Sequence, residues 1–167
     1  SRDKVLIDAK HLAPDGKARA DGAYKVQRPK SNVFQKDELA DVKALLARKD
    51  EALHELIGSG NFAEVYRGVN RATNKNMAIK IIDLRKASKH YRETMLPQEI
   101  AIIKQLKHPN IIKIYHISQV GLKVILVMEY ASKGTLSDLI CAIGGLAEPV
   151  AWLLFSQLFA GLAYMHG

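Results

Sequence analysis

The residues of this sequence that are best suited to chemistry lie between positions 57 and 80. Gly58 and Gly60 belong to a glycine-rich turn that follows an apolar run, and Lys80 ends a strand-like run further on. Because glycine has no side chain, the backbone at these two positions can approach a bulky anion closely, and a nearby lysine supplies positive charge. The pattern predicts a nucleotide pocket on a twisted hairpin, and an ordinary hairpin with structural glycines is the alternative.

Two other glycine-rich phosphate loops do not fit the residues around this turn. A dinucleotide-binding loop opens a helix, whereas residues 64–69 are typical of a strand, and Gly68 with the following turn argues against a helix. A Walker loop requires Gly-Lys-Ser/Thr after its glycines, and this tripeptide is absent. Val65 and Ala78 would instead form an apolar surface beside the nucleotide.

The elements that must position these residues form an α+β arrangement. The apolar patterning predicts a five-stranded antiparallel sheet with one helix, which Pro97 opens and which ends before Pro109. Ile100, Ile103 and Leu106 form the inward stripe of that helix, and residues 85–94 are expected to be irregular. The predicted strands cover residues 53–57, 64–69, 77–82, 111–117 and 122–128, and the predicted helix covers residues 98–107.

The sequence changes character after residue 128. A loop over residues 131–135 precedes a short helix over 137–143 and a long apolar helix over 148–165. Because glycines and Glu148-Pro149 interrupt this apolar stretch, we expect buried helices and no membrane span. The last helix is apolar on nearly all sides. If no other part of the protein covers this helix, its apolar surface would promote self-association, which light scattering would detect. The oligomeric state stays open.

The N-terminal part has a different composition. Residues 1–36 hold nine Lys/Arg and four Asp, which gives a net charge of +5, and their Pro, Gly and Asp content predicts a largely disordered segment. Residues 37–52 are expected to form an amphipathic helix and linker. This helix would either pack on the following domain, residues 53–128, or serve as a regulatory or partner helix. A further segment over 129–167 completes the predicted organisation.

Composition limits the classes of function. Apolar residues make up 48% and charged residues 25%, as in globular proteins. The charge of +8 is scattered and does not alternate with exposed aromatic residues, so nucleic-acid binding is not expected. The single Cys141 and the charged opening, which does not resemble a signal peptide, favour an intracellular, cytoplasmic protein.

The glycine-rich turn and the strand ending at Lys80 together resemble the nucleotide-binding motifs of protein kinases. Ala63 and Met77 depart from the family pattern, in which a third glycine and a valine occupy these positions. The sequence is identified as a member of this family over about residues 53–167, and it looks most similar to serine/threonine kinases of the calmodulin-dependent group, in particular testis-specific serine kinases. The remaining motifs are Lys80-Ile81-Ile82-Asp83, Leu96-Pro97-Gln98-Glu99-Ile100, Lys107-His108-Pro109-Asn110-Ile111-Ile112, Leu126-Val127-Met128-Glu129-Tyr130, Gly134-Thr135-Leu136 and Tyr164-Met165-His166-Gly167.

The resemblance implies specific roles. Lys80 would contact the α- and β-phosphates of ATP and pair with Glu99, the acidic residue of the following helix, although a first-turn acid favoured by the helix dipole is the alternative for Glu99. Met128 would be the gatekeeper, and backbone groups of Glu129 and Ala131 would bind adenine. Thr135 and Asp138 would lie near the ribose. The implied nucleotide-binding residues are Ile57, Gly58, Ser59, Gly60, Asn61, Phe62, Ala63, Val65, Ala78, Lys80, Ile112, Met128, Glu129, Ala131 and Thr135.

The catalytic and metal-binding motifs of the family do not occur in these residues. A kinase takes its base from an H-R-D loop and holds Mg²⁺ with that loop's Asn and the D-F-G aspartate, and neither motif is present. We therefore expect the N-terminal portion of an ATP- and Mg²⁺-dependent kinase that acts on protein substrates, with no metal ligand in this chain and no activity in isolation. A pseudokinase or truncated binding module is the alternative.

Overall fold

The structure is a computed structural model that describes residues 34–35 and 37–167. The chain divides into a unit that contains the sheet and ends at Ala131, and a helical unit over Ser132–Gly167. The prediction for residues 1–36 therefore lies almost wholly outside the described residues. Each unit is described below by itself.

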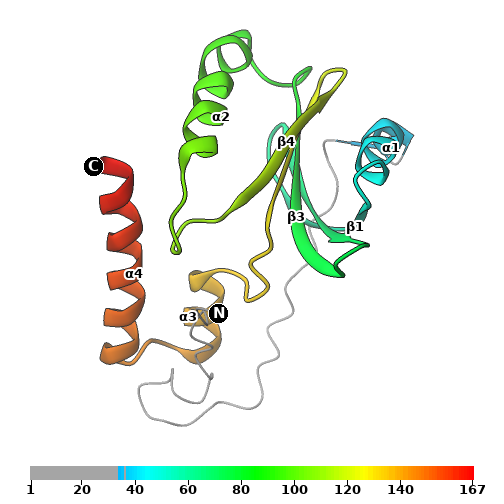
Figure 1. Cartoon of the computed structure of the whole chain (residues 1–167). Coiled ribbons are helices and arrows are strands. Elements are labelled where there is room, and N and C mark those ends of the chain that lie inside the picture. Colours follow the sequence, from blue (N-terminus) through cyan, green and yellow to red (C-terminus); the bar gives the residue numbers. More distant parts are fainter. Residues whose placement is uncertain (1–33, 36) are drawn as a thin grey trace. The chain divides into compact units, whose positions relative to one another are not determined.

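The first unit is built on a five-stranded antiparallel sheet, as the sequence predicts (Figure 1). The strand order is β1-β2-β3-β5-β4, so β3 lies at the centre and β4 and β1 form the edges. Turns after Asn70 and at Gly121, which has a positive φ of 53°, reverse the chain between neighbouring strands. The strands are β1 (Glu51–Ser59), β2 (Ala63–Asn70), β3 (Lys75–Asp83), β4 (Ile114–Val120) and β5 (Lys123–Glu129).

One face of the sheet is closed by the helix that the sequence predicts at the start of the domain. The 3₁₀ turn η2 (Asp37–Leu39) leads into α1 (Ala40–Ala47), which lies on the side of the sheet opposite α2 (Leu96–Gln105) in Figure 1. This face is called the α1 face below. Its buried core consists of Phe34, Leu39, Val42, Leu46, Tyr66, Met77, Ile79, Ile81, Ile125 and Val127.

Ion pairs surround the core of the α1 face. Asp41 of α1 accepts from Lys123 Nζ at 2.8 Å, and Glu38 accepts from Arg85 Nη2 at 2.7 Å. Arg85 also bonds the fully buried carboxylate of Asp83 at 2.7 Å, which joins the end of β3 to the turn before α1. The apolar contacts and these pairs together hold α1 on the sheet, as the first of the two alternatives expects, and a regulatory or partner role of this helix stays a prediction.

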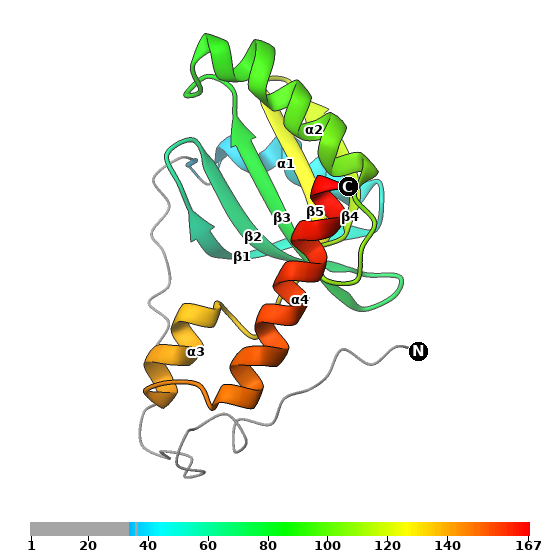
Figure 2. The same ribbon diagram turned by 90° about the vertical axis from the view of Figure 1, so that its left-hand side faces the viewer.

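The opposite face, called the α2 face below, packs against α2. Leu96 of α2 is buried with Ile82, Val124 and Leu126 of the sheet. Figure 2 shows α2 in front of the sheet and α1 behind it. The predicted inward residues Ile100 and Ile103 pack against this cluster, and Leu96 extends the stripe by one turn.

The prediction that residues 85–94 are irregular is wrong at its C-terminal end. The helical run begins at Lys89 and continues through the π-helical turn η3 (Tyr91–Met95) into α2. Proline has no N–H and its ring clashes with the carbonyl four residues earlier, so a wider turn before Pro97 lets the helix continue, and Leu96 N–H donates to the Tyr91 carbonyl. Contacts of Tyr91 and Leu96 with the sheet stabilise a segment that has no helical periodicity of its own.

Two strands differ in length from their predictions. β1 extends beyond residues 53–57 in both directions because pairing with β2 continues through two register shifts. β4 begins at Ile114, later than the predicted residue 111, since Ile111 N–H donates to the His108 carbonyl at 3.1 Å and keeps the preceding residues in a turn. Side-chain patterning does not show where such a turn ends.

The second unit contains two helices. In α3 (Leu136–Ile143), Thr135 and Asp138 form a capping box, and Gly144 ends the helix at φ 75°. The buried helix expected over residues 148–165 is not buried among the described residues, and its surface is uncovered. In α4 (Glu148–His166) the large apolar side chains are between 37% and 73% exposed, namely Trp152, Leu153, Phe155, Leu158, Phe159, Leu162 and Met165. Among the described residues, no helix is long and apolar enough to cross a membrane.

Candidate nucleotide-binding site

The register of the sheet brings the predicted phosphate-binding residues into one row. Gly58 of β1 lies opposite Val65 of β2, and Val65 lies opposite Lys80 of β3. Paired residues of antiparallel strands lie about 5 Å apart, so Val65 is a direct neighbour of both Gly58 and Lys80, which are 22 positions apart in the sequence. The structure thus brings together the first glycine, the apolar residue and the lysine that the sequence singled out.

A second row on the same face supplies an apolar surface. Ala78 lies opposite Met128 of β5, two residues before Lys80 on β3. Side chains two apart on a strand point to the same face, so Ala78, Met128 and Lys80 share the α2 face. Ala78 is buried and Met128 is half-buried. This is the small, apolar floor that the predicted adenine pocket requires.

The glycine-rich turn is held by backbone hydrogen bonds. Gly60 N–H donates to the Ala63 carbonyl at 2.8 Å, which closes the turn, and Asp83 N–H donates to the Phe62 carbonyl at 2.8 Å, which ties it to the end of β3. Ser59 and Asn61 are exposed at the tip. The turn therefore presents short polar residues outward and keeps the Phe62 side chain half-buried.

The glycines of this turn differ from a glycine that the fold itself requires. A Cβ at Gly68 would lie 2.9 Å from the Ala52 carbonyl oxygen, so a side chain does not fit there. A Cβ at Gly58 or Gly60 would meet its nearest neighbour at 3.6 Å, which is ordinary van der Waals contact. Neither residue has a positive φ. Packing within the chain therefore does not demand Gly58 and Gly60, which is the outcome expected where the space serves a ligand.

The predicted ion pair between Lys80 and Glu99 is not formed. Among the described residues, no acidic group lies within ion-pair distance of Lys80 Nζ. Glu99 Oε2 instead accepts a hydrogen bond from the Tyr91 hydroxyl at 3.1 Å. Burial, and then this bond to Glu99, raises the pKa of Tyr91 to about 12. The roles given to Lys80 and Glu99 remain predictions, and Tyr91 was not predicted, because no local sequence pattern marks a tyrosine eight residues before Glu99.

The predicted hinge residues follow the end of β5. Glu129 N–H donates to the Lys113 carbonyl at 2.8 Å, whereas Ala131, which is exposed, forms no hydrogen bond with the described residues. Ile57 is half-buried, and Ile112 is 44% exposed before β4 begins. Thr135 belongs to the second unit, where its hydroxyl accepts from Asp138 N–H in the capping box.

The family follows from this geometry together with a match to a family model. The model of the protein kinase domain matches residues 52–167. The chain belongs to the protein kinase family. The matched span begins in β1 and includes every residue of the two rows, so the glycine-rich turn and the lysine of β3 lie in a kinase sheet.

Similar proteins agree with a serine/threonine kinase family. The chain is 31% identical to calcium-dependent protein kinase 5 of Plasmodium berghei (strain Anka), over 99% of this chain and 31% of the relative. It is 35% identical to CBL-interacting serine/threonine-protein kinase 12 of Arabidopsis thaliana, over 77% of this chain and 26% of the relative. The chain thus spans less than a third of the length of these relatives, and it covers only the N-terminal part of the kinase domain.

A solved structure shows the same kinase fold. A crystal structure of Rad53 residues 1–466 in complex with AMP-PNP superimposes with a TM-score of 0.62 at 29% identity, covering 72% of this chain and 31% of that one. The sheet with α2 is therefore the N-terminal lobe of a kinase, and the helices after residue 132 begin the C-terminal lobe. The nearer likeness to testis-specific serine kinases stays a prediction.

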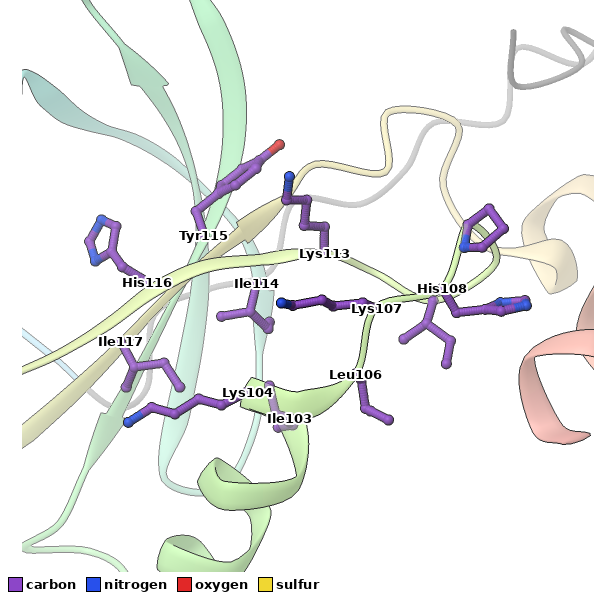
Figure 3. A pocket seen from close by; sticks show the side chains of 12 residues that line it. Ile103, Lys104, Leu106, Lys107, His108, Lys113, Ile114, Tyr115, His116 and Ile117 are labelled. Carbon is purple, nitrogen blue, oxygen red and sulfur yellow. The ribbon is translucent and has the colours of Figure 1, made fainter. Parts of the chain in front are cut away.

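The first unit also contains a pocket of about 800 Å³, whose lining includes Ile111 and Lys113 on either side of Ile112. It lies between the end of α2 and β4, with Lys104 and Lys107 extending across it (Figure 3). None of the predicted site residues lines it. Its lining is Ile103, Lys104, Leu106, Lys107, His108, Pro109, Ile111, Lys113, Ile114, Tyr115, His116 and Ile117.

Among the described residues, no group of three or more His, Cys, Asp or Glu side chains could hold a metal.

Proposed function

We propose that this chain is the ATP-binding part of a protein serine/threonine kinase. The observation that carries the proposal is the row Gly58–Val65–Lys80, which sets a glycine-rich turn beside a lysine on the α2 face. Ala78 and Met128 form the neighbouring apolar surface. The arrangement offers a cation for phosphates and an apolar floor for a base, which together suit a nucleotide.

The residues present fit ATP, whose transferable γ-phosphoryl group supplies the chemistry. Lys80 would hold the phosphates, the glycine-rich turn would cover them, and the backbone of Glu129 and Ala131 would meet the adenine. In the complete protein the γ-phosphoryl group passes from Mg²⁺-bound ATP to a serine or threonine hydroxyl of a protein substrate. We predict that the chain alone does not phosphorylate protein, because the H-R-D and D-F-G motifs that provide base and metal ligands do not occur in it.

The alternative function is a kinase-like module that binds partners, and nucleotide in some cases, without catalysis. The presence of both Lys80 and Glu99 favours an active parent protein, since a purely binding fold has less need of them. In the complete protein, Lys80→Met is expected to abolish phosphoryl transfer and leave the fold intact. Unchanged transfer in that variant would refute the role of Lys80. We also propose an intracellular location, because the single Cys141 cannot form a disulfide within this chain.

Titration of ATP into the chain tests this proposal. Calorimetry on the wild type is expected to show one site, and Lys80→Met is expected to weaken ATP by roughly tenfold or more, because a charge-assisted phosphate contact is lost. Lys43→Met, on the exposed side of α1, is the matched control and should bind as the wild type does. Thermal unfolding by circular dichroism checks that each variant is folded. No binding by a folded wild type, or equal binding by Lys80→Met, would contradict the proposal.

A further inference from the structure

Tyr91 contacts two parts of the proposed nucleotide site at once. Its ring packs against Phe62 of the glycine-rich turn, with the ring centroids 4.9 Å apart and the planes at 54°. Its hydroxyl donates to Glu99 Oε2 at 3.1 Å. One side chain thus joins the turn that would cover the phosphates to the acid that would hold Lys80.

The position of Tyr91 is fixed from several directions. Its N–H donates to Ser88 Oγ at 3.1 Å, and its carbonyl accepts from Leu96 N–H in the π-helical turn. The ring packs among the partly buried side chains beside the α2 core, which include Phe62 and Leu84. The tyrosine is therefore part of the packed structure and its hydroxyl is presented at a defined place.

This bond changes what Glu99 can do. Lys80 has no carboxylate partner among the described residues, while the carboxylate of Glu99 is engaged by a neutral phenol. A phenol is protonated throughout the neutral range, so Tyr91 remains a donor there, and burial with the bond to Glu99 raises its pKa further, to about 12. A hydrogen bond to an ionised group is stronger than one between neutral groups, so it opposes movement of Glu99 to Lys80.

We propose that Tyr91 is a positioning residue that holds Glu99 apart from Lys80 and keeps Phe62 against the helical segment, so that the nucleotide site rests in a state of reduced affinity. The proposal deepens the ATP-binding function and rests on it. When the contact breaks, Glu99 is free to pair with Lys80 and the glycine-rich turn is free to move. A factor that draws Tyr91 away would therefore raise nucleotide affinity without touching the nucleotide.

The variant Tyr91→Phe tests the hydroxyl while keeping the ring against Phe62. ATP affinity is expected to rise by roughly three- to tenfold, since a bond to a charged group is removed from the competing state. The gain should vanish in the Glu99→Gln background, because the hydroxyl acts through that carboxylate. Tyr115→Phe, which removes a phenol elsewhere in the same unit, is the matched control and should leave ATP affinity unchanged.

A second readout does not depend on nucleotide. Lys80 is labelled with limiting acetic anhydride, and its modification is quantified by mass spectrometry relative to exposed Lys43. An amine that gains a carboxylate partner is protonated more fully and reacts more slowly, so Tyr91→Phe is expected to slow acetylation of Lys80 severalfold, and Tyr115→Phe should not. Thermal unfolding of each variant confirms that the comparison is made on folded protein.

The outcomes separate the two proposals. If the wild type fails to bind ATP but Tyr91→Phe slows Lys80 acetylation, the proposed function fails and the positioning role stands. If the wild type binds ATP but Tyr91→Phe binds ATP equally or more weakly, the positioning role is overturned and the proposed function stands. The same holds if Tyr91→Phe still raises ATP affinity in the Glu99→Gln background. Unchanged acetylation of Lys80 in folded Tyr91→Phe also overturns it, because the ion pair has then not formed.

Discussion

The two faces of the sheet are formed by the same strands but are packed in different ways. On the α1 face, alternate residues of β3 and β5 are fully buried under α1, and ion pairs such as Asp41–Lys123 join helix to sheet. On the α2 face, the central strand carries Lys80, and half-buried Val65 and Met128 lie beside it. One face is closed by apolar contacts, whereas the other keeps a charge and space at its centre.

This difference separates stability from binding. Burial of apolar surface is the main favourable term in folding, and the α1 face supplies a large part of it without any residue of the nucleotide site. The α2 face can therefore carry Lys80, which has no ion-pair partner in the part of the chain that the structure describes, and glycines that packing does not require. Substitutions on the two faces should accordingly change different quantities, the free energy of unfolding on one and ATP affinity on the other.

The largest expected effect is on the α1 face. Leu46→Ala removes a side chain that is 1% exposed between α1 and the sheet, and truncation of a buried leucine typically costs about 2–5 kcal/mol of unfolding free energy. Urea denaturation measures the change. Ile102→Ala, at a position 59% exposed on α2, is the control and is expected to stay within about 0.5 kcal/mol of the wild type. Equal losses for both variants would show that α1 is not a structural part of the fold.

A smaller effect distinguishes the two kinds of glycine. Gly68→Ala places a Cβ 2.9 Å from the Ala52 carbonyl oxygen, and overpacking of this kind costs about 1–3 kcal/mol. Gly60→Ala meets only ordinary contacts and is expected to change the unfolding free energy by less than about 0.5 kcal/mol, while weakening ATP. Urea denaturation and ATP titration measure the two quantities. A Gly60→Ala protein that is destabilised but binds ATP normally would show that Gly60 serves the fold and not the nucleotide.

The smallest effect concerns pH and the fully buried Asp83. Hydrogen bonds from Arg85 hold the pKa of the Asp83 carboxyl below its usual range. Since the folded-state pKa is lower than the unfolded value of about 3.9, the stabilisation is present above that value and is lost as pH falls through the folded-state pKa. The urea midpoint of the wild type should therefore drop more steeply than that of Asp83→Asn below about pH 4. Parallel curves would show that Asp83 has no lowered pKa.

The sequence predicted the elements of the sheet well because their patterns are strong. Alternating and continuous apolar runs identified all five strands, and the amphipathic pattern within residues 37–52 identified α1, although spacing alone could not say that α1 packs on the sheet. The errors lie where tertiary contacts decide. The helical turn at Tyr91 forms because Tyr91 and Leu96 contact the sheet, and β4 starts late because the His108–Ile111 turn precedes it.

The sequence predicted which residues lie in the candidate site better than it predicted the hydrogen bonds between their side chains. Gly58, Val65 and Lys80 were expected together, and the strand register places them in one row. The Glu99 carboxylate was assigned to Lys80, but it bonds Tyr91 in the structure. Which of two nearby donors an acid chooses depends on side-chain geometry across two elements, and this information is not contained in the spacing of residues along the chain.

Hydrogen exchange measured by mass spectrometry, with and without ATP, tests the central claim most directly, because it reports on both faces in one experiment. We expect slow exchange in α1 and β3 without ligand, and added protection by ATP at the residues of the proposed site, namely 57–65, 78–80, 112 and 128–131, with α1 unchanged. Protection by ATP at residues 103–109, on the α2 side of the pocket of Figure 3, without protection at residues 57–65, or fast exchange throughout α1, would contradict the division between a stabilising face and a binding face.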